Sequence, residues 1–290
     1  MFDDTQNVAE NTRYKRYMNI LKRVSYSVAA RCVQPWQQKH FERTVYGKEI
    51  AKYKGAYTGR RCFFIGNGPS LKAEDLNTLQ KHGEITFAFN RIYNIFNETC
   101  WRPTFYISQD EKMLLGCADI VNQLDLPVKF IPIQTHWYHG INIHDALYFN
   151  MNWQQEEEPD KFLFSDNAAR ELDCANTGMY TAAQMAVYMG FTEIYFIGVD
   201  HHFHISQNLK GEIVVDNTVK DYFSDEYNQD KENLYIPNTE KSTLTYIAMK
   251  KQCDKRNIKV FNATRGGMLE VFPRVEFDTL FNKQVTGKEE

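Results

Sequence analysis

The stretch Phe63-Phe64-Ile65-Gly66-Asn67-Gly68-Pro69-Ser70 decides the fold of this chain, because an apolar run passes directly into a glycine turn. Without a Cβ, Gly66 and Gly68 give the backbone access to positive φ and let a ligand approach closely. The pattern predicts a buried strand followed by a turn that holds a phosphate. An ordinary strand-to-helix turn is the alternative.

The residues that complete this turn favour the start of a helix. Asn67 adds a side-chain amide, Pro69 fixes φ, and Ser70 is expected to cap the following helix, whose free N–H groups attract anions. The turn is not a Walker A motif, because no Gly-Lys-Ser/Thr follows at the required spacing. It also lacks the third glycine of the dinucleotide-binding pattern.

The composition is that of a globular protein. The 290 residues are 43% hydrophobic and 14% aromatic, enough to bury a substantial core. No run approaches the roughly 18 apolar residues of a membrane span, and the amino terminus lacks the basic start of a signal peptide, so a cytoplasmic location is expected. The cysteines form no C-x-x-C pair and predict neither a zinc site nor a disulfide framework.

Charge divides the chain into two parts. Residues 11–61 contain thirteen Lys or Arg but only Glu42 and Glu49 as acids, whereas the rest carries an excess of acids. Apolar residues at helical spacing over 14–28 predict a basic amphipathic helix. Its expected partner is an anionic membrane surface at the inner face of the membrane, or equally the acidic main domain. Nothing in the pattern favours nucleic acid.

From residue 61 onward, apolar runs alternate with helical patterns. Strands are predicted at 62–66, 85–89, 104–108, 128–132, 194–198 and 258–262, and helices at 71–82, 112–123, 177–190 and 240–256. This alternation predicts an α/β, Rossmann-like, mostly parallel sheet with helices on both faces. The expected organisation is a helical extension over 1–60, a catalytic domain over 61–282 and a tail over 283–290. Residues 133–175 and 201–237 are expected to form insertions or lids.

Ligands of such sheets bind at the carboxyl ends of the strands, so the residues after each strand are the candidate site. They are Gly66, Asn67, Gly68, Pro69, Ser70, Asn90, Asp110, Asp200, His201, His202, His204, Arg265 and Gly266, joined by Asn176, Thr177 and Gly178 at a helix start.

Each group in this set suits a particular chemistry. Imidazoles titrate near neutrality, so one of His201, His202 and His204 is expected to act as a general base or acid. Asp200 is expected to turn its carboxylate toward the cleft, and Arg265 beside Gly266 is expected to contact phosphate. Asp200 and Asp110 lack a third metal ligand at standard spacing, so no metal site is predicted.

The motifs Gly66–Leu71, Phe89–Tyr93, Thr177–Met179, Ile194–Asp200 and Asn262–Gly267 together resemble the 6-hydroxymethylpterin pyrophosphokinase-like (MptE-like) family of Rossmann-like proteins. The glycine turn, the later asparagine and the Thr-Gly helix start also resemble bacterial lipooligosaccharide sialyltransferases. The resemblance covers about residues 60–280. It implies that Asn67 and Asn90 bind a donor nucleotide and that Thr177 and Gly178 contact donor or acceptor.

The chain departs from the sialyltransferase pattern in three places. Cys174 stands where those enzymes have an arginine, and a phosphate-binding tyrosine position falls on or near His202. No histidine occurs around Ile236–Thr239, where they carry their base. Either one of the three clustered histidines replaces that base or the acceptor chemistry differs.

The sequence favours a glycosyltransferase that uses a nucleotide-activated sugar, with a CMP-nonulosonic acid as the expected donor, a glycan or glycolipid as acceptor, and no cofactor. Surface polysaccharide or glycolipid synthesis is the expected setting. The alternatives are a diphosphotransferase that uses ATP and magnesium, and a nucleotide-binding protein without catalysis. The pattern indicates no oligomeric state.

Overall fold

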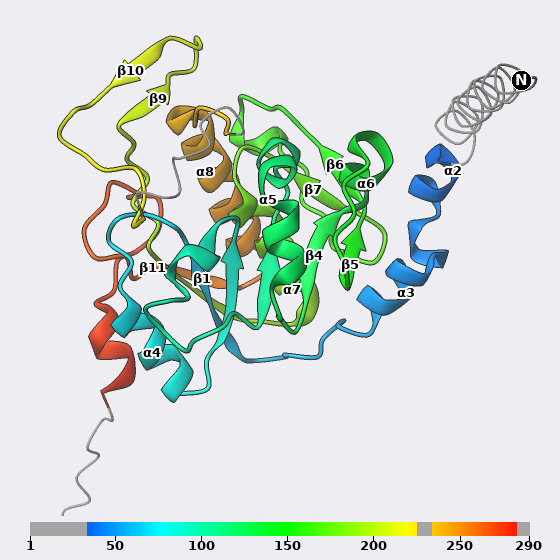
Figure 1. Cartoon of the computed structure of the whole chain (residues 1–290), viewed down its shortest axis with the longest axis horizontal. Helices are drawn as coiled ribbons and strands as arrows, with labels where there is room; N and C mark the ends of the chain where they lie inside the picture. The colour runs from blue at the N-terminus through cyan, green and yellow to red at the C-terminus, as the bar shows by residue number, and fades with distance from the viewer. Residues whose placement is uncertain (1–33, 225–233, 283–290) are drawn as a thin grey trace, which may run out of the picture.

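The computed structural model describes residues 34–224 and 234–282, and its centre is a parallel sheet of seven strands (Figure 1). The strand order is β11-β8-β1-β2-β3-β4-β5. The bounds are β1 (Arg61–Ile65), β2 (Ile85–Phe89), β3 (Phe105–Ile107), β4 (Lys129–Pro132), β5 (Ala146–Phe149), β8 (Glu193–Ile197) and β11 (Lys259–Asn262). The predicted α/β, Rossmann-like fold is confirmed.

Helices connect these strands, and two small sheets extend the carboxyl edge. The helices are α2 (Gln34–Lys39), α3 (Val45–Ala51), α4 (Ala73–Lys81), α5 (Glu111–Gln123), α6 (Ile133–His139), α7 (Gly178–Met189) and α8 (Thr239–Lys255), with 3₁₀ turns at Phe41–Arg43, Ile92–Ile95, Pro159–Lys161 and Phe277–Phe281. The small sheets pair β6 (Met151–Trp153) with β7 (Leu172–Cys174), and β9 (Ile205–Gln207) with β10 (Ile213–Val215).

The direction of strand addition reverses at β1. The chain proceeds from β1 through β5 on one side and then adds β8 and β11 on the other. Right-handed crossovers then place the helices of the two halves on opposite faces of the sheet. A ligand crevice is expected where the order reverses, between the carboxyl ends of β1 and β8.

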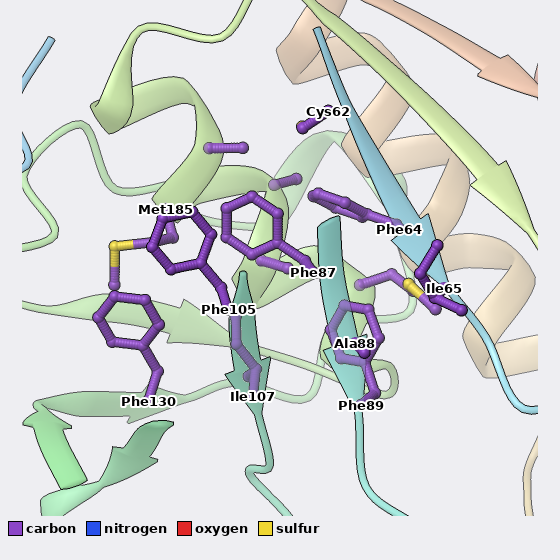
Figure 2. Close-up of a cluster of buried hydrophobic side chains, with 14 of the residues drawn as sticks. Cys62, Phe64, Ile65, Phe87, Ala88, Phe89, Phe105, Ile107, Phe130 and Met185 are labelled. Atoms are coloured by element: carbon purple, nitrogen blue, oxygen red, sulfur yellow. The ribbon is translucent and has the colours of Figure 1, made fainter. Parts of the chain in front are cut away.

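Both faces of the sheet are covered by aromatic packing. Successive residues of a strand point to opposite faces, and Phe63 stacks at 6.0 Å on Phe281, whereas Phe64 packs with Phe196, which meets Tyr246 of α8 at 6.1 Å. Figure 2 shows the second cluster, in which Phe64, Phe87, Phe105 and Phe130 line up near Met185 of α7. These fully buried rings fix the sheet that carries the site.

Residues 34–60 pack on the main domain. Phe41 and Ile50 are buried, and Tyr57 stacks on Phe191 with ring centroids 4.9 Å apart. The end of the predicted 1–60 extension is thus built into the core, because its apolar side chains cover the sheet. The helix predicted at 14–28 and the tail at 283–290 lie outside the described residues.

Residues 133–175 differ from the predicted lid. They contain β5, the edge strand of the main sheet, which pairs with β4 from Lys129↔Ala146 to Pro132↔Phe149. The four residues of β5 lie in a polar, aromatic stretch, so the apolar pattern of the strand does not stand out in the sequence. Residues 201–224 form the β9–β10 hairpin, which projects from the carboxyl edge (Figure 1), and the segment after it.

The described cysteines are free thiols, and all except Cys100 are buried. Burial raises the pKa of Cys174 and of Cys253 to about 12. Across 34–224 and 234–282, none of the helices is both long and apolar enough to cross a bilayer.

Candidate functional site

The glycine turn after β1 is joined to the loop after β8. Gly66 N donates to Ile197 O and Gly68 N donates to Gly198 O, each over 2.8 Å. A Cβ on Gly66 would lie 2.8 Å from the carbonyl carbon of Gly198, too close for any side chain. Neither Gly66 nor Gly68 has a positive φ. Glycine is needed here for the close approach of two loops, not for the predicted conformation.

Ser70 also binds a protein group and does not cap a helix. Helix α4 begins at Ala73 with Lys72 in the N-cap position. The Ser70 amide and hydroxyl instead donate to Oδ2 of Asp200 over 3.3 Å and 2.7 Å. Burial raises the pKa of the Asp200 carboxyl, against the effect of these hydrogen bonds. The predicted cap is wrong because the Ser70 hydroxyl donates instead to a carboxylate 130 residues away in the chain. With the amides of Gly66, Gly68 and Ser70 all bonded to protein, the turn has few free N–H groups left for an anion.

The two candidate asparagines fasten the strand ends. Asn67 Nδ2 donates to Phe89 O over 3.0 Å, and Asn90, with φ of 54°, accepts from Ser108 Oγ over 3.2 Å. Because a carbonyl oxygen can only accept hydrogen bonds, the group of Asn67 that points toward Phe89 O must be its NH₂. Asn67 Oδ1 then has no hydrogen-bond partner among the described residues.

Two helices begin at the same edge of the sheet. Asp110 caps α5 by accepting from Met113 N over 3.0 Å, and burial raises its pKa. Thr177 caps α7 and also contacts the Tyr246 hydroxyl at 3.3 Å. Asn176 Nδ2 donates to Thr245 of α8 over 3.2 Å. The start of α7 is therefore held against the first half of α8.

The three histidines occupy different environments. His201 Nε2 lies 2.7 Å from Thr243 Oγ1, and burial lowers the pKa of His201 to about 4. His202 Nε2 lies 2.9 Å from Asp216 Oδ2. His204 Nδ1 lies 2.9 Å from Asp216 O at the base of the β9–β10 hairpin. Only His202 combines a carboxylate partner with a partly exposed ring.

Asp216 is itself held in place. Its Oδ1 accepts hydrogen bonds from the Thr218 amide over 2.9 Å and the Thr218 hydroxyl over 2.6 Å. The other oxygen, Oδ2, is left to orient His202. The hydrogen bonds to Thr218 lower the pKa of Asp216 and keep it ionised.

A cavity of about 960 Å³ lies over the carboxyl ends of the strands. The sequence-predicted residues that line it are Gly66, Asn67, Gly68, Asn90, Asp110, Asn176, Thr177, Gly178, Asp200, His201 and His202. Pro69, Ser70, His204, Arg265 and Gly266 are not among the lining residues. The sheet edge thus brings most of the predicted set around one space.

Arg265 lies outside the lining of the cavity and is bound by protein carboxylates. Its guanidinium donates to Asp75 over 2.9 Å and to Asp278 over 2.8 Å, and Gly266 O accepts from Arg274. The predicted contact of Arg265 with phosphate is therefore corrected, because its guanidinium already forms ion pairs with two carboxylates.

A family model described as 6-hydroxymethylpterin diphosphokinase MptE-like matches residues 37–206. The chain belongs to this family. No curated protein matches it. Among solved structures, the MAf glycosyltransferase from Magnetospirillum magneticum AMB-1 is 15% identical, with a TM-score of 0.47, over 82% of this chain and 39% of that one. The chain spans less than half the length of that neighbour.

The cavity of this family member includes residues that the sequence did not single out. They are, among others, Gln109, Gln134, Tyr138, Trp153, Tyr235 and Lys241. Lys241 is the single Lys or Arg among the described lining residues, against Asp110, Glu111, Asp200 and Asp221. No sequence signal separates such residues from ordinary surface positions.

The described residues contain no group of three or more His, Cys, Asp or Glu able to hold a metal ion. Asp110 and Asp200 both line the cavity. They follow β3 and β8, whose carboxyl ends are three strand spacings apart, roughly 14 Å, so the two carboxylates are not placed to share one ion. Mg²⁺ is commonly bound by a single carboxylate together with substrate phosphates, and either aspartate suits that role.

Proposed function

We propose that this protein is a transferase that moves a sugar from a nucleotide-activated donor to an acceptor hydroxyl, with a cytidine monophosphate sugar as the preferred donor. The observation that carries this proposal is the charge of the cavity. One lysine and four carboxylates line its described part. A donor with a single phosphate suits this balance better than a triphosphate, whose several charges need compensation.

The donor phosphate is assigned to the start of α7, not to the glycine turn. The amides of Gly66 and Gly68 are already bonded to the carbonyls of Ile197 and Gly198. The amino terminus of α7 and the side chain of Lys241 face the same cavity. Helix amino termini and lysines both favour phosphate oxygens.

His202 is assigned as the general base. With Nε2–H donating to Asp216, the lone pair of Nδ1 is free to take the proton of the acceptor hydroxyl. The acceptor oxygen then bonds to the anomeric carbon, while the bond from that carbon to the phosphate oxygen breaks and the nucleotide leaves with the electron pair. Lys241 offsets the charge that develops on the leaving phosphate.

His201 and His204 are poorer candidates for this step. The pKa of His201, about 4, makes it a weak base at neutral pH, and its Nε2 is bonded to Thr243. His204 does not line the cavity.

Thermal shift with CMP, UMP, ADP and ATP, each with and without Mg²⁺, tests the donor. We expect CMP to stabilise the protein without metal, and Lys241→Met to weaken CMP binding about tenfold, the loss of one charge-assisted contact. Lys250→Met, on the outer part of α8 where Lys250 pairs with Asp254, is the control and leaves CMP binding unchanged. Stabilisation by ATP only with Mg²⁺, and none by CMP, would overturn the proposal.

Turnover of the donor tests the base. His202→Gln is expected to lower kcat by about 10² to 10⁴, the usual contribution of a general base, with CMP affinity unchanged. His144→Gln, at an exposed position outside the cavity, is the control. Full activity of His202→Gln would refute the assignment.

A second function is favoured by the family description and by the aspartates of the cavity: diphosphate transfer from ATP, with Asp110 or Asp200 as the protein ligand of a phosphate-bound Mg²⁺. The same thermal-shift series separates it from sugar transfer. A nucleotide-binding protein without catalysis would bind nucleotide but turn over none of the donors. Contact with an anionic membrane through the basic residues of 11–61 stays a prediction.

A further inference from the structure

Two aromatic side chains stand at the outer end of the cavity, over β4 and β5. Tyr138 of α6 is 59% exposed and Trp153 of β6 is 48% exposed, and both line the cavity. Within the described residues, neither ring stacks on another aromatic ring. Large exposed aromatics beside a polar cavity mark a binding surface.

The elements that carry these two rings are tied together by a buried amide. Gln134 of α6 donates from Nε2 to Met151 O over 3.0 Å and accepts from Met151 N through Oε1 over 3.0 Å. Tyr138 lies one helical turn after Gln134, and Trp153 lies two residues after Met151 and so on the same face of β6 as the Met151 side chain. The clamp therefore fixes the relative position of the two backbone segments from which the rings project.

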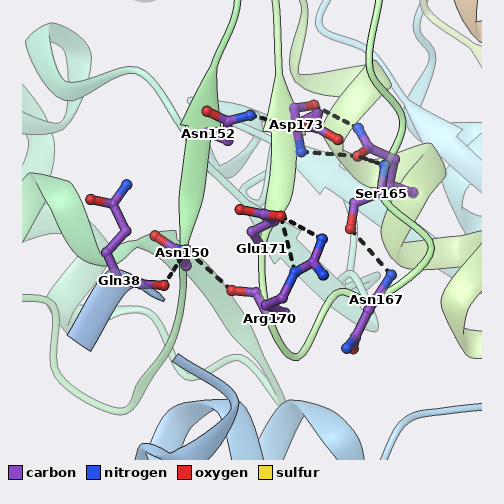
Figure 3. Close-up of polar contacts among 9 residues, drawn as sticks. Gln38, Asn150, Asn152, Ser165, Asn167, Arg170, Glu171 and Asp173 are labelled. Carbon is purple, nitrogen blue, oxygen red and sulfur yellow. Dashed lines mark hydrogen bonds and ion pairs between the residues drawn. The ribbon is translucent and has the colours of Figure 1, made fainter. Parts of the chain in front are cut away.

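A second layer supports this clamp. Gln134 Nε2 also donates to Asn150 Oδ1 over 2.8 Å, and Asn150 is 1% exposed. Asn150 Nδ2 in turn donates to Gln38 O and Arg170 O, and Asn152 Nδ2 donates to Asp173, as Figure 3 shows. Every amide nitrogen of this layer is bonded to protein, so the base is rigid before any ligand binds.

We propose that Tyr138 and Trp153 form a platform on which a neutral sugar ring of the acceptor stacks. This inference rests on the proposed sugar transfer and names the acceptor class. The face of a sugar ring is apolar and packs on aromatic rings, while its hydroxyls bond to amides such as those of Asn152 and Gln155, which line the same end.

Charge and exposure favour the acceptor over the donor at this platform. Glu111 lines the cavity, and Glu156-Glu157-Glu158 follow Gln155 directly in the chain, which disfavours a phosphate-bearing donor. Rings about half exposed leave a bound sugar open to solvent, as a longer glycan requires.

The platform also sets the size of the acceptor. The carboxyl ends of β8, which leads to His202, and of β4, which leads to α6, are four strand spacings apart, roughly 19 Å. This exceeds one sugar ring. The acceptor is therefore an oligosaccharide or polysaccharide, with its reactive end toward His202 and an inner ring on the platform.

Saturation-transfer NMR with neutral trisaccharides (cellotriose, maltotriose and triacetylchitotriose) and with glucose as the short probe tests the platform. We expect at least one trisaccharide to bind wild type more tightly than glucose does. Trp153→Ala and Tyr138→Ala are each expected to weaken it about tenfold, and Trp153→Phe to retain most of the affinity. Trp36→Ala, an exposed tryptophan outside the cavity lining, is the control.

CMP binding to the same variants separates this inference from the proposed function. CMP affinity is expected to be unchanged in Trp153→Ala. If the sugars bind through the platform but CMP does not bind wild type, the donor proposal fails and the platform stands. If Trp153→Ala loses CMP but no trisaccharide, the platform holds the nucleobase and the inference is wrong. Absence of binding by every trisaccharide also overturns it.

Discussion

Replacing Arg265 by methionine tests whether this guanidinium serves the fold or a ligand. Arg265 holds Asp75 of α4 through Nη2–Oδ1 at 2.9 Å and Nε–Oδ2 at 3.3 Å, and the Asp75 side chain is only 9% exposed. Breaking a buried pair costs about 3–5 kcal/mol because one charge is left without its partner. Arg265 is about one-third exposed, and Asp75 lies in the first turn of α4, where the helix dipole favours it. The expected loss is therefore about 2–3 kcal/mol.

Urea unfolding of wild type, Arg265→Met, Asp75→Asn and the double variant measures this coupling. We expect the double variant to recover about 1–2 kcal/mol of the sum of the single losses, because neither charge is then left alone. Asp278→Asn removes the other, exposed partner and is the control, with little change expected. Calorimetric titration of CMP should show unchanged affinity in Arg265→Met. An intact unfolding curve together with lost CMP binding would refute this reasoning.

Three further outcomes are expected. Gly66→Ala should destabilise the fold by about 1–3 kcal/mol in urea unfolding, because its Cβ meets backbone of the loop after β8. Gly178→Ala should cost less, because its Cβ would lie 3.3 Å from the side-chain ring of Phe89 and not against backbone. Equal losses would contradict the close-approach argument. Because burial lowers the pKa of His201 to about 4, the unfolded chain takes up its proton first as pH falls below about 6.5, so stability is lost from there down to about pH 4. Chemical denaturation across this pH range should show that the free energy of unfolding falls by about 2 kcal/mol less in His201→Gln than in wild type. Parallel pH profiles for the two proteins would count against a buried imidazole. Iodoacetamide followed by peptide mapping should label Cys100 quickly and spare the buried Cys174, whose pKa is about 12; equal labelling would show that the core opens.

The sheet was predictable because its signals are local. Each of the six predicted strands corresponds to a strand of the structure, and the four predicted helices to α4, α5, α7 and α8. A buried strand needs only a short apolar run, and helices of nine to seventeen residues show their period clearly. Strand β5 was not predicted because its four residues lie in a polar, aromatic stretch, and α3 was not predicted because its basic surroundings suggested a separate module.

The partners of the polar residues were less predictable, because they come from distant parts of the chain. Ser70 was predicted to cap a helix, but its hydroxyl donates a hydrogen bond to Asp200. Arg265 was predicted to bind phosphate, but its guanidinium forms an ion pair with Asp75. Local spacing identifies which residues lie at the sheet edge but not what they bond to. Trp153 is an extreme case, because its place beside the cavity depends on the pairing of β6 with β7 and on the Gln134 clamp.

The arrangement at β1 separates the part of the site that defines the fold from the part that selects the substrate. The glycine turn joins β1 to β8 through two backbone hydrogen bonds and a contact that admits no side chain, so it must be kept whatever the protein binds. The start of α7, Lys241 of α8 and His202, which is hydrogen-bonded to Asp216, border the same cavity but take no part in that contact. Changes in these segments can therefore alter which ligands the cavity accepts while the turn stays fixed. It follows that the glycine motif by itself identifies the fold but not the reaction. The residues that decide what the protein binds and does must be sought in α7, α8 and the segment after β8.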